Sequence, residues 1–511
     1  MTAGLSLLFV ALVCLLTLVV GGFGLRLSRQ TSDFYVAGRT VSPRLNASAI
    51  GGEYLSAASF LGVAGLIYDL GVDQLWLPVG YTLGYLVLLV LVAAPMRRSG
   101  SYTLPDFAEA RLGSGPIRAI ASVLVVAIGW LYLLPQFTGA GLVLSLVAGV
   151  PSWVGGLVVA VIVALAVGAG GMRSITFSQA VQYWIKLTAI TVPAIVLLIM
   201  WNRAGAPFPR DTPAGWAIPL TPRFDGDHPT YRTYSTMVAL CLGTMGLPHV
   251  LVRYYTNPDG GGARRTTVHV LALLGIFYLI PPVYAVLGRV DLPSLPEGFR
   301  PDSIVLQLPS VVVPGLWGDL LTALLAGGAF AAFLSTASGV AMSVAGVLDQ
   351  SVFRPAVRRW SLGDAPANRS FRIAAVIAIL VPYAVSRLLG PIGLAQLVVI
   401  AFTVAASTFA PLLILGVWWR RLSTVGAATA LLVGAATSTT ALVIGQILGT
   451  RPGWGVALVS WPALWCVPLT MLVGVAVSLA TPGFVPARTA RIMARLHTPE
   501  RVDLVKSRRW G

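Results

Sequence analysis

The sequence has very little charge for its length. Only 10% of its 511 residues are charged, 56% are hydrophobic, and the mean hydropathy is +0.83. Soluble domains carry about 25% charged residues, so this composition excludes a water-soluble globular protein and places most of the chain in a lipid bilayer. The net charge of +17 is attributed to basic residues retained on the cytoplasmic side of the membrane, and nucleic acid is not an expected partner.

Cysteine, histidine and enzyme motifs are scarce as well. The three cysteines, Cys14, Cys241 and Cys466, lie in apolar runs, and neither a CxxC pair nor a Cys/His cluster points to a disulfide framework or a zinc site. The four histidines are scattered, and GxxxxGK[ST], HExxH and GxSxG are absent. The sequence therefore predicts no enzymatic activity, no catalytic residues and no organic cofactor.

Long apolar runs dominate the sequence. Thirteen of them have the length of about 20 residues that is needed to cross a bilayer. They lie at about residues 2–25, 45–68, 74–96, 119–150, 152–172, 174–202, 233–252, 266–288, 320–348, 370–389, 393–419, 422–448 and 454–480. The expected fold class is an all-α polytopic membrane protein with about 13 transmembrane helices.

The basic residues predict how these spans are oriented. No basic residue precedes the first span, and Arg26 and Arg29 follow it, so it is not a cleavable signal peptide and the N-terminus lies outside. Thirteen spans then place the C-terminus in the cytoplasm. Of the 35 Lys and Arg residues, the inner connections and the tail carry 26 and the outer connections carry 8. This asymmetry supports a multi-pass protein of the cell membrane with that orientation.

Two spans are expected to be broken in mid-membrane. The second contains paired glycines, a carboxylate and small hydroxyl residues at 49–59, and the seventh contains glycines and a proline at 243–249. Unwound backbone is tolerated within a membrane only where it is buried in protein or lines a cavity. The two spans are five apart, as the first helices of two inverted five-helix repeats would be. The spacing alone leaves open a five-plus-five core or a generic helical bundle.

This reading divides the chain into four parts. An extra helix precedes a ten-helix core, two further helices follow it, and a basic cytoplasmic tail ends the chain. The parts span residues 1–30, 31–420, 421–480 and 481–511.

Two charged residues fall inside the predicted spans. Glu53 is a candidate for substrate binding or coupling, because an intramembrane carboxylate is a functional candidate by default; a carboxylate that is hydrogen-bonded at the helix break is the structural alternative. Lys186 is expected to extend toward an interface as a structural lysine.

Several neutral polar residues in the spans are further candidates. Gln136, Thr244 and His249 are candidates for substrate binding or coupling, or they hydrogen-bond neighbouring helices. Ser335 and Thr336 offer a pair of hydroxyl oxygens in the ninth span, which serve either close helix packing or a monovalent cation.

Three stretches carry a family resemblance: residues 52–62 (GEYLSAASFLG), 170–179 (GGMRSITFSQ) and 246–259 (GLPHVLVRYYTNPD). They resemble the sodium/solute symporter family, and especially its cation/acetate (monocarboxylate) permease branch. The resemblance covers about residues 30–420. It implies a five-plus-five inverted-repeat, LeuT-like core that works by alternating access and is driven by sodium.

The resemblance also implies a sodium site between the broken second span and the ninth span. Its ligands would be the carbonyl oxygens of Gly52, Leu55 and Ala332 and the hydroxyls of Ser335 and Thr336. The expected function is sodium-coupled symport of a small organic anion, a short-chain monocarboxylate such as acetate. The expected partners are this anion, sodium ion and the lipid bilayer. Whether a small accessory membrane protein also binds is left open by the sequence.

The sequence is also compatible with other functions. A proton-coupled monocarboxylate permease would use Glu53 and His249. A sodium symporter for proline, a sugar or pantothenate would use the same fold. A membrane sensor that binds a solute without moving it is a further alternative, although a basic tail of residues 481–511 is too short for a signalling domain.

Overall fold

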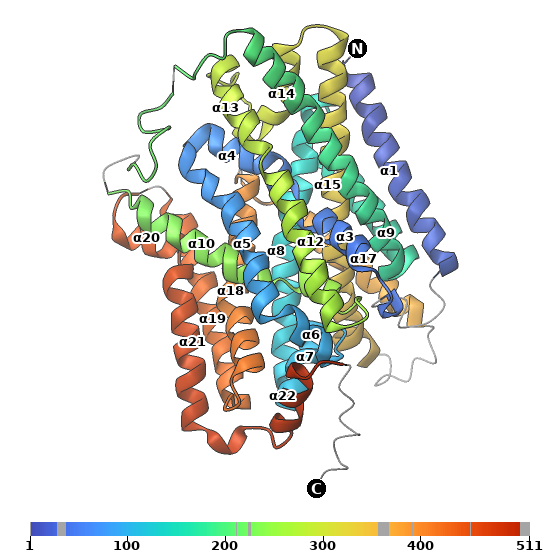
Figure 1. Cartoon of the computed structure of the whole chain (residues 1–511), viewed down its shortest axis with the longest axis vertical. Coiled ribbons are helices and arrows are strands. Elements are labelled where there is room, and N and C mark those ends of the chain that lie inside the picture. The colour runs from blue at the N-terminus through green and yellow to red at the C-terminus, as the bar shows by residue number, and fades with distance from the viewer. Residues whose placement is uncertain are drawn as a thin grey trace.

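The computed structural model describes residues 2–27, 37–210, 212–222, 226–355, 367–390, 392–449 and 451–500. Within these ranges the chain is a bundle of long helices joined by short connections (Figure 1). The predicted basic positions Arg29, Arg358 and Arg359 and the tail beyond residue 500 lie outside the described residues.

The described residues up to Tyr278 form the first group of principal helices. They are α1 (Thr2–Leu27), α3 (Pro43–Tyr54), the π-helix η2 (Ala58–Gly62), α4 (Val63–Leu70), α5 (Trp76–Leu91), α6 (Ala93–Ser99), α7 (Leu104–Leu112), α8 (Gly115–Ala148), α9 (Ser152–Arg203), α10 (Pro229–Gly246), α11 (Pro248–Tyr254) and α12 (Gly260–Tyr278).

The second half continues the bundle. Its helices are α13 (Pro281–Asp291), α14 (Ile304–Val312), α15 (Leu316–Leu348), α17 (Ala367–Ser386), α18 (Leu394–Trp418), α19 (Thr424–Leu448), α20 (Trp454–Ser460), α21 (Ala463–Ala480) and α22 (Thr489–His497).

The predicted spans agree with these helices. Among the described residues, 11 helical segments are long and apolar enough to cross a membrane, and two bent helix pairs raise the number to 13. Both bent pairs are the spans predicted to be broken: Pro43–Tyr54 with Ala58–Leu70, bent by 69°, and Pro229–Gly246 with Pro248–Tyr254, bent by 47°. The all-α fold class with about 13 spans is confirmed.

The long helix α9 holds two of these spans. Gly171 interrupts it with φ 62° and ψ −177°, a backbone conformation that a residue with a Cβ rarely adopts. The spans on either side, Ser152–Ala169 and Gly171–Arg203, therefore meet without a connecting loop. The second of them carries Lys186.

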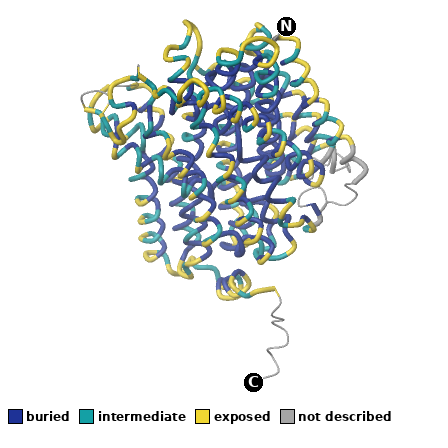
Figure 2. Tube along the Cα trace, turned by 45° about the horizontal axis from the view of Figure 1, so that its top comes forward, coloured by how far each residue is buried: buried dark blue, intermediate teal, exposed yellow. Residues whose placement is uncertain are grey.

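The burial of the spans separates the core from the lipid-facing shell. In the apolar windows of α15 and α18, 78% and 83% of the residues are buried, compared with 22% in α1. Figure 2 shows the same pattern, with buried residues in the middle of the bundle and exposed ones around it. Exposed leucines such as Leu8, Leu12 and Leu15 on α1 suit contact with lipid. The two broken spans contact the buried helices α15 and α18.

The last described helix closes one end of the bundle. In Figure 1, α1 begins at one end of the molecule and α22 lies at the other, beside α6 and α7. The buried guanidinium of Arg111 in α7 donates to the carbonyls of Gly416 (2.8 Å) and Trp419 (3.1 Å) and to the hydroxyl of Thr489 (3.2 Å). One arginine thus joins α7, the end of α18 and the start of α22.

Candidate functional site

The first broken span changes direction at Leu55–Ala57. Helix α3 ends at Tyr54 and the next helical element, η2, begins at Ala58. The paired glycines at 51 and 52, expected to belong to the break, lie inside α3, because their absent side chains let α3 approach α9. A Cβ on Gly52 would lie 2.1 Å from the carbonyl oxygen of Gln179, and one on Gly51 would lie 2.8 Å from the Tyr183 ring.

The oxygens at the end of α3 surround a cation that belongs to the protein. The Lys186 ammonium of α9 donates to the carbonyl oxygens of Gly52 (2.5 Å) and Leu55 (2.7 Å). Its third bond goes to the Ser335 hydroxyl of α15 (2.9 Å). An ammonium has three N–H donors, so these three oxygens satisfy all of them. Three of the five residues predicted to bind sodium thus contact Lys186.

The expectation that Lys186 extends toward an interface is wrong. Its side chain is fully buried and points between α3 and α15. The last helical turn of α3 presents carbonyl oxygens and the negative end of the helix dipole. This environment attracts a cation inside the protein and removes the need for contact with water.

The other two predicted sodium ligands have other hydrogen-bond partners. The carbonyl of Ala332 accepts a hydrogen bond from the Ser335 hydroxyl (3.1 Å). The Thr336 hydroxyl donates to the carbonyl of Glu53 (2.6 Å) and so joins α15 to α3. The residues predicted for a sodium site therefore lie close together. The amine of Lys186 hydrogen-bonds to three of them.

The intramembrane carboxylate of Glu53 forms an ion pair across the two broken spans. Its Oε2 lies 2.5 Å from Nε of Arg253 in α11, and the two side chains are 2% and 1% exposed. Arg253 also donates to the Thr176 hydroxyl (2.7 Å) and to the Gln179 side-chain oxygen. Gly339 leaves room for the pair, because a Cβ there would lie 2.2 Å from the Glu53 carboxyl.

Arg253 is a residue that our sequence interpretation did not single out. It lies 200 residues from Glu53 in the chain, although the stretch that carries the resemblance includes it. Its charge is the signal that could have identified it, because a buried carboxylate needs a partner of opposite charge. Arg253 follows the second predicted break. Two inverted five-helix repeats would place this break opposite the first break, where Glu53 lies.

Three charged side chains meet at this centre: Glu53, Arg253 and Lys186. All three are buried, and Glu53 lies within electrostatic reach of both cations. When each is ionised, the group carries a net charge of +1. A buried excess charge is costly, so the centre favours the approach of an anion.

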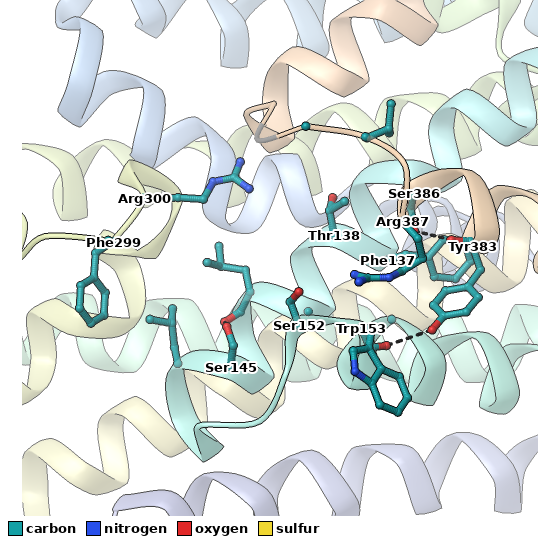
Figure 3. Close-up of a pocket in the computed structure, with 17 residues that line it drawn as sticks. Phe137, Thr138, Ser145, Ser152, Trp153, Phe299, Arg300, Tyr383, Ser386 and Arg387 are labelled. Atoms are coloured by element: carbon teal, nitrogen blue, oxygen red, sulfur yellow. Dashed lines mark hydrogen bonds between the residues drawn. The ribbon is translucent and has the colours of Figure 1, made fainter.

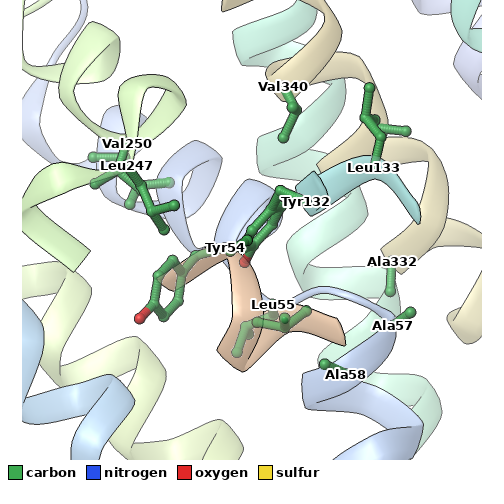
Figure 4. Close-up of a cluster of buried hydrophobic side chains, with 14 of the residues drawn as sticks. Tyr54, Leu55, Ala57, Ala58, Tyr132, Leu133, Leu247, Val250, Ala332 and Val340 are labelled. Carbon is green, nitrogen blue, oxygen red and sulfur yellow. The ribbon is translucent and has the colours of Figure 1, made fainter. Parts of the chain in front are cut away.

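An aromatic cluster lies next to the break. The Tyr54 ring packs edge-on against Tyr85 and Tyr81, with ring centres 4.7 and 6.0 Å apart, and against Phe402 at 6.1 Å. Its hydroxyl lies 3.0 Å from the hydroxyl of Thr244 in α10. Figure 4 shows this region, with residues from both sides of the first break beside others of α8 and α15.

His249 lies at the start of α11, beside the second break. Its ring centre is 4.6 Å from that of Tyr132 in α8. The residue is 1% exposed, and neither ring nitrogen has a hydrogen-bond partner among the described residues. The hydroxyls of Tyr81 and Tyr85 are also buried without a partner there. Unpaired buried polar atoms are costly, so this set can receive a polar ligand.

Gln136 of α8 holds the first turn after the break. Its side-chain oxygen accepts a hydrogen bond from the backbone N–H of Ala57 (3.0 Å), and the residue is fully buried. Of the predicted substrate or coupling candidates, Glu53, Gln136, Thr244 and His249, this residue has the clearest structural role. It fixes the direction in which the chain leaves α3.

We expect Gln136→Leu to lower stability by about 1–3 kcal/mol, because the Ala57 N–H would be buried without an acceptor. The thermal unfolding midpoint of the purified protein measures this effect. Thr138→Val on the same helix removes a hydroxyl that donates only within α8, to the carbonyl of Leu134 (3.1 Å), and serves as the control, with an expected midpoint close to that of the wild type. An unchanged midpoint in Gln136→Leu would contradict the assigned role.

Two cavities lie away from this centre. Figure 3 shows the larger one, of about 470 Å³, between α8, α9 and α17, with the guanidinium groups of Arg300 and Arg387 extending into it from two sides. None of the predicted site residues lines it. The smaller cavity, of about 170 Å³, lies where α5, α10 and α18 approach one another. Arg232 lines it and forms an ion pair with Asp73 (3.7 Å).

Solved structures share this fold. A Na⁺-coupled sialic acid symporter in its substrate-bound outward-open state aligns with a TM-score of 0.68 and 15% identity, covering 93% of this chain and 97% of that one. Mhp1, a nucleobase-cation-symport-1 family transporter in a closed conformation, aligns with a TM-score of 0.53 and 13% identity, covering 91% and 99%. These likenesses confirm the LeuT-like class of fold.

Sequence relatives point the same way. The uncharacterized symporter YwcA of Bacillus subtilis (strain 168) is 32% identical over 435 residues, which are 84% of this chain and 83% of that protein. A monocarboxylic acid transporter of Corynebacterium glutamicum is 29% identical over 485 residues, 88% of this chain and 87% of that protein. The model of the sodium:solute symporter family matches residues 34–434. The chain therefore belongs to the sodium:solute symporter family.

Proposed function

We propose that this solute symporter carries a short-chain monocarboxylate, such as acetate, across the cell membrane by alternating access. The observation that carries the proposal is the buried group of one acidic side chain, Glu53, and two basic ones, Arg253 and Lys186, which has a net charge of +1 when each is ionised. An organic anion that binds beside this group balances the charge, whereas a neutral sugar leaves it unbalanced. The monocarboxylic acid transporter among the relatives supports the same class of substrate.

The carboxylate would bind between the two breaks. His249, Tyr81 and Tyr85 carry buried polar atoms without partners in the described structure, and a carboxylate accepts hydrogen bonds from such N–H and O–H groups. The hydroxyls of Thr244 and Tyr54, 3.0 Å apart, add two further polar groups to this cluster. The surrounding rings favour a substrate with a short apolar part.

Residues 31–420 would form the moving core, with the first and the last two spans packed around it. Asp73, in the short 3-10 helix η3 (Val72–Leu75) before α5, and Arg232 of α10 form an ion pair beside the smaller cavity. They would separate when the core opens on that side. With the N-terminus outside, as the basic residues predict, this is the extracellular side.

The coupling ion has two candidates. Sodium follows from the family, and its predicted ligands Gly52, Leu55, Ala332, Ser335 and Thr336 stay a prediction. A proton is the second candidate. The contacts of Lys186 favour it over sodium, because the amine already hydrogen-bonds to three of the oxygens that would have to coordinate sodium.

Uptake of labelled acetate, pyruvate and proline into proteoliposomes tests the proposal, with a sodium gradient and a proton gradient imposed separately. We expect acetate or pyruvate to accumulate above the level of protein-free vesicles, and proline not to accumulate. Accumulation of proline alone would overturn the monocarboxylate proposal and leave the symporter assignment intact.

A further inference from the structure

The predicted sodium site contains a positive charge that is covalently attached to the protein. We propose that the Lys186 ammonium is the resident cation of this site and takes the place of sodium there. This inference deepens the proposed function, because it concerns the ion requirement of the same broken-helix centre. Sodium then neither binds between α3 and α15 nor is required there for transport.

The hydrogen bonds of the ammonium carry the inference. Its three N–H groups meet three oxygens at 2.5, 2.7 and 2.9 Å, one each from Gly52, Leu55 and Ser335. A sodium ion held by the same oxygens would have to displace the ammonium. Displacement would leave a buried amine without acceptors, because Lys186 is fully buried. The three oxygens therefore already accept hydrogen bonds from the ammonium and are not free to coordinate an additional sodium ion.

The spacing of the helices supports the same assignment independently. Gly52 and Gly51 bring α3 against α9, and a single Cβ on Gly52 would meet the backbone of Gln179 at 2.1 Å. This approach lets an amine that starts from α9 reach the end of α3. The nearest acid, Glu53, already has Arg253 as its partner at 2.5 Å. Backbone and hydroxyl oxygens, the usual ligands of a hard monovalent cation, are thus what Lys186 contacts.

Lys186 also links the two helices that sodium would link, and it joins its own helix to them. A sodium ion on the predicted ligands would join α3 to α15. The ammonium makes the same connection and adds α9 to it. A tethered cation of this kind stays with the protein through every turnover.

Thermal unfolding without any substrate tests the inference, so its failure is distinct from failure of the monocarboxylate proposal. The purified full chain is heated in sodium chloride and in choline chloride at equal ionic strength. We expect equal midpoints for the wild type. We expect the midpoint of Lys186→Ala to be about 2–4 °C higher in sodium than in choline, because sodium can satisfy the three vacated oxygens.

Matched variants make the result specific. Lys186→Met fills the space without a charge, and we expect it to show no sodium effect. Lys186→Ala combined with Ser335→Ala lacks one ligand, and we expect its sodium shift to be at most half of that of Lys186→Ala. Equal shifts in the single and the combined variant would overturn the assignment of the vacated site.

A direct measurement on the wild type covers the case in which Lys186→Ala does not fold. Binding of labelled sodium is compared between the wild type and Ser335→Ala. We expect the same binding, or none, in both, because sodium does not use Ser335. Saturable sodium binding by the wild type that is lost in Ser335→Ala would overturn the inference.

Discussion

Replacement of Arg253 by glutamine is expected to lower the stability of the protein by about 3–5 kcal/mol, because it leaves the Glu53 carboxylate buried without its partner. The two side chains are 1% and 2% exposed and lie 2.5 Å apart. The same change removes the donors to Thr176 and Gln179. The thermal unfolding midpoint in detergent and the yield of folded protein in the membrane would both fall.

Two further variants separate the ion pair from a general effect of charge. Arg265→Gln removes the same charge from an exposed position on α12, and we expect its midpoint to stay close to that of the wild type. The combination of Glu53→Gln with Arg253→Gln removes both buried charges and should recover part of the lost stability. A combination that is as unstable as the sum of the single variants would show that the ion pair is not the cause.

Gly52→Ala should abolish most uptake and lower stability by about 1–3 kcal/mol, because the new methyl group meets the backbone of α9. The Cβ would lie 2.1 Å from a carbonyl oxygen that cannot rotate away as a side chain would. Helix α3 would have to move off α9, and the Gly52 carbonyl would move away from Lys186. Uptake of labelled acetate and the unfolding midpoint measure the two effects.

Two other glycines provide the comparison. Gly275→Ala on α12 meets nothing within 4 Å, so alanine there should be neutral or slightly stabilising. Gly51→Ala meets the Tyr183 ring at 2.8 Å, and we expect an intermediate effect because a ring can shift. Full activity of Gly52→Ala would mean that the close approach of α3 and α9 is dispensable.

Much of the architecture could be predicted from the sequence because lipid imposes simple constraints. Length and hydropathy located the 13 spans, and glycine and proline placed the breaks in the second and seventh of them. The need to pair backbone groups in a bilayer makes such breaks stand out. The exact residues of the first break were harder to predict, because glycines such as Gly51 and Gly52 also allow close contact between helices.

The candidate site was harder to predict because it depends on contacts between distant parts of the chain. The predicted cation ligands do lie together, but their partner Lys186 is 149 residues from Ser335. A positional signal existed: Lys186 is about 18 Å along its helix from Ser174 and about 24 Å from Asn202, at 1.5 Å per residue. A lysine at that depth is too far from either interface to reach it, and must find acceptors inside the protein.

The buried arginine at the closed end of the bundle has a consequence for biosynthesis. The acceptors of Arg111 follow it by 305, 308 and 378 residues. At about 5–20 residues per second, a ribosome supplies the last of them roughly 20–75 s after it has made the arginine. The guanidinium must stay hydrated or held by an insertion factor during that interval. Ribosome stalling before residue 489 would therefore yield a nascent chain whose early segments are inserted while this end stays open to a protease.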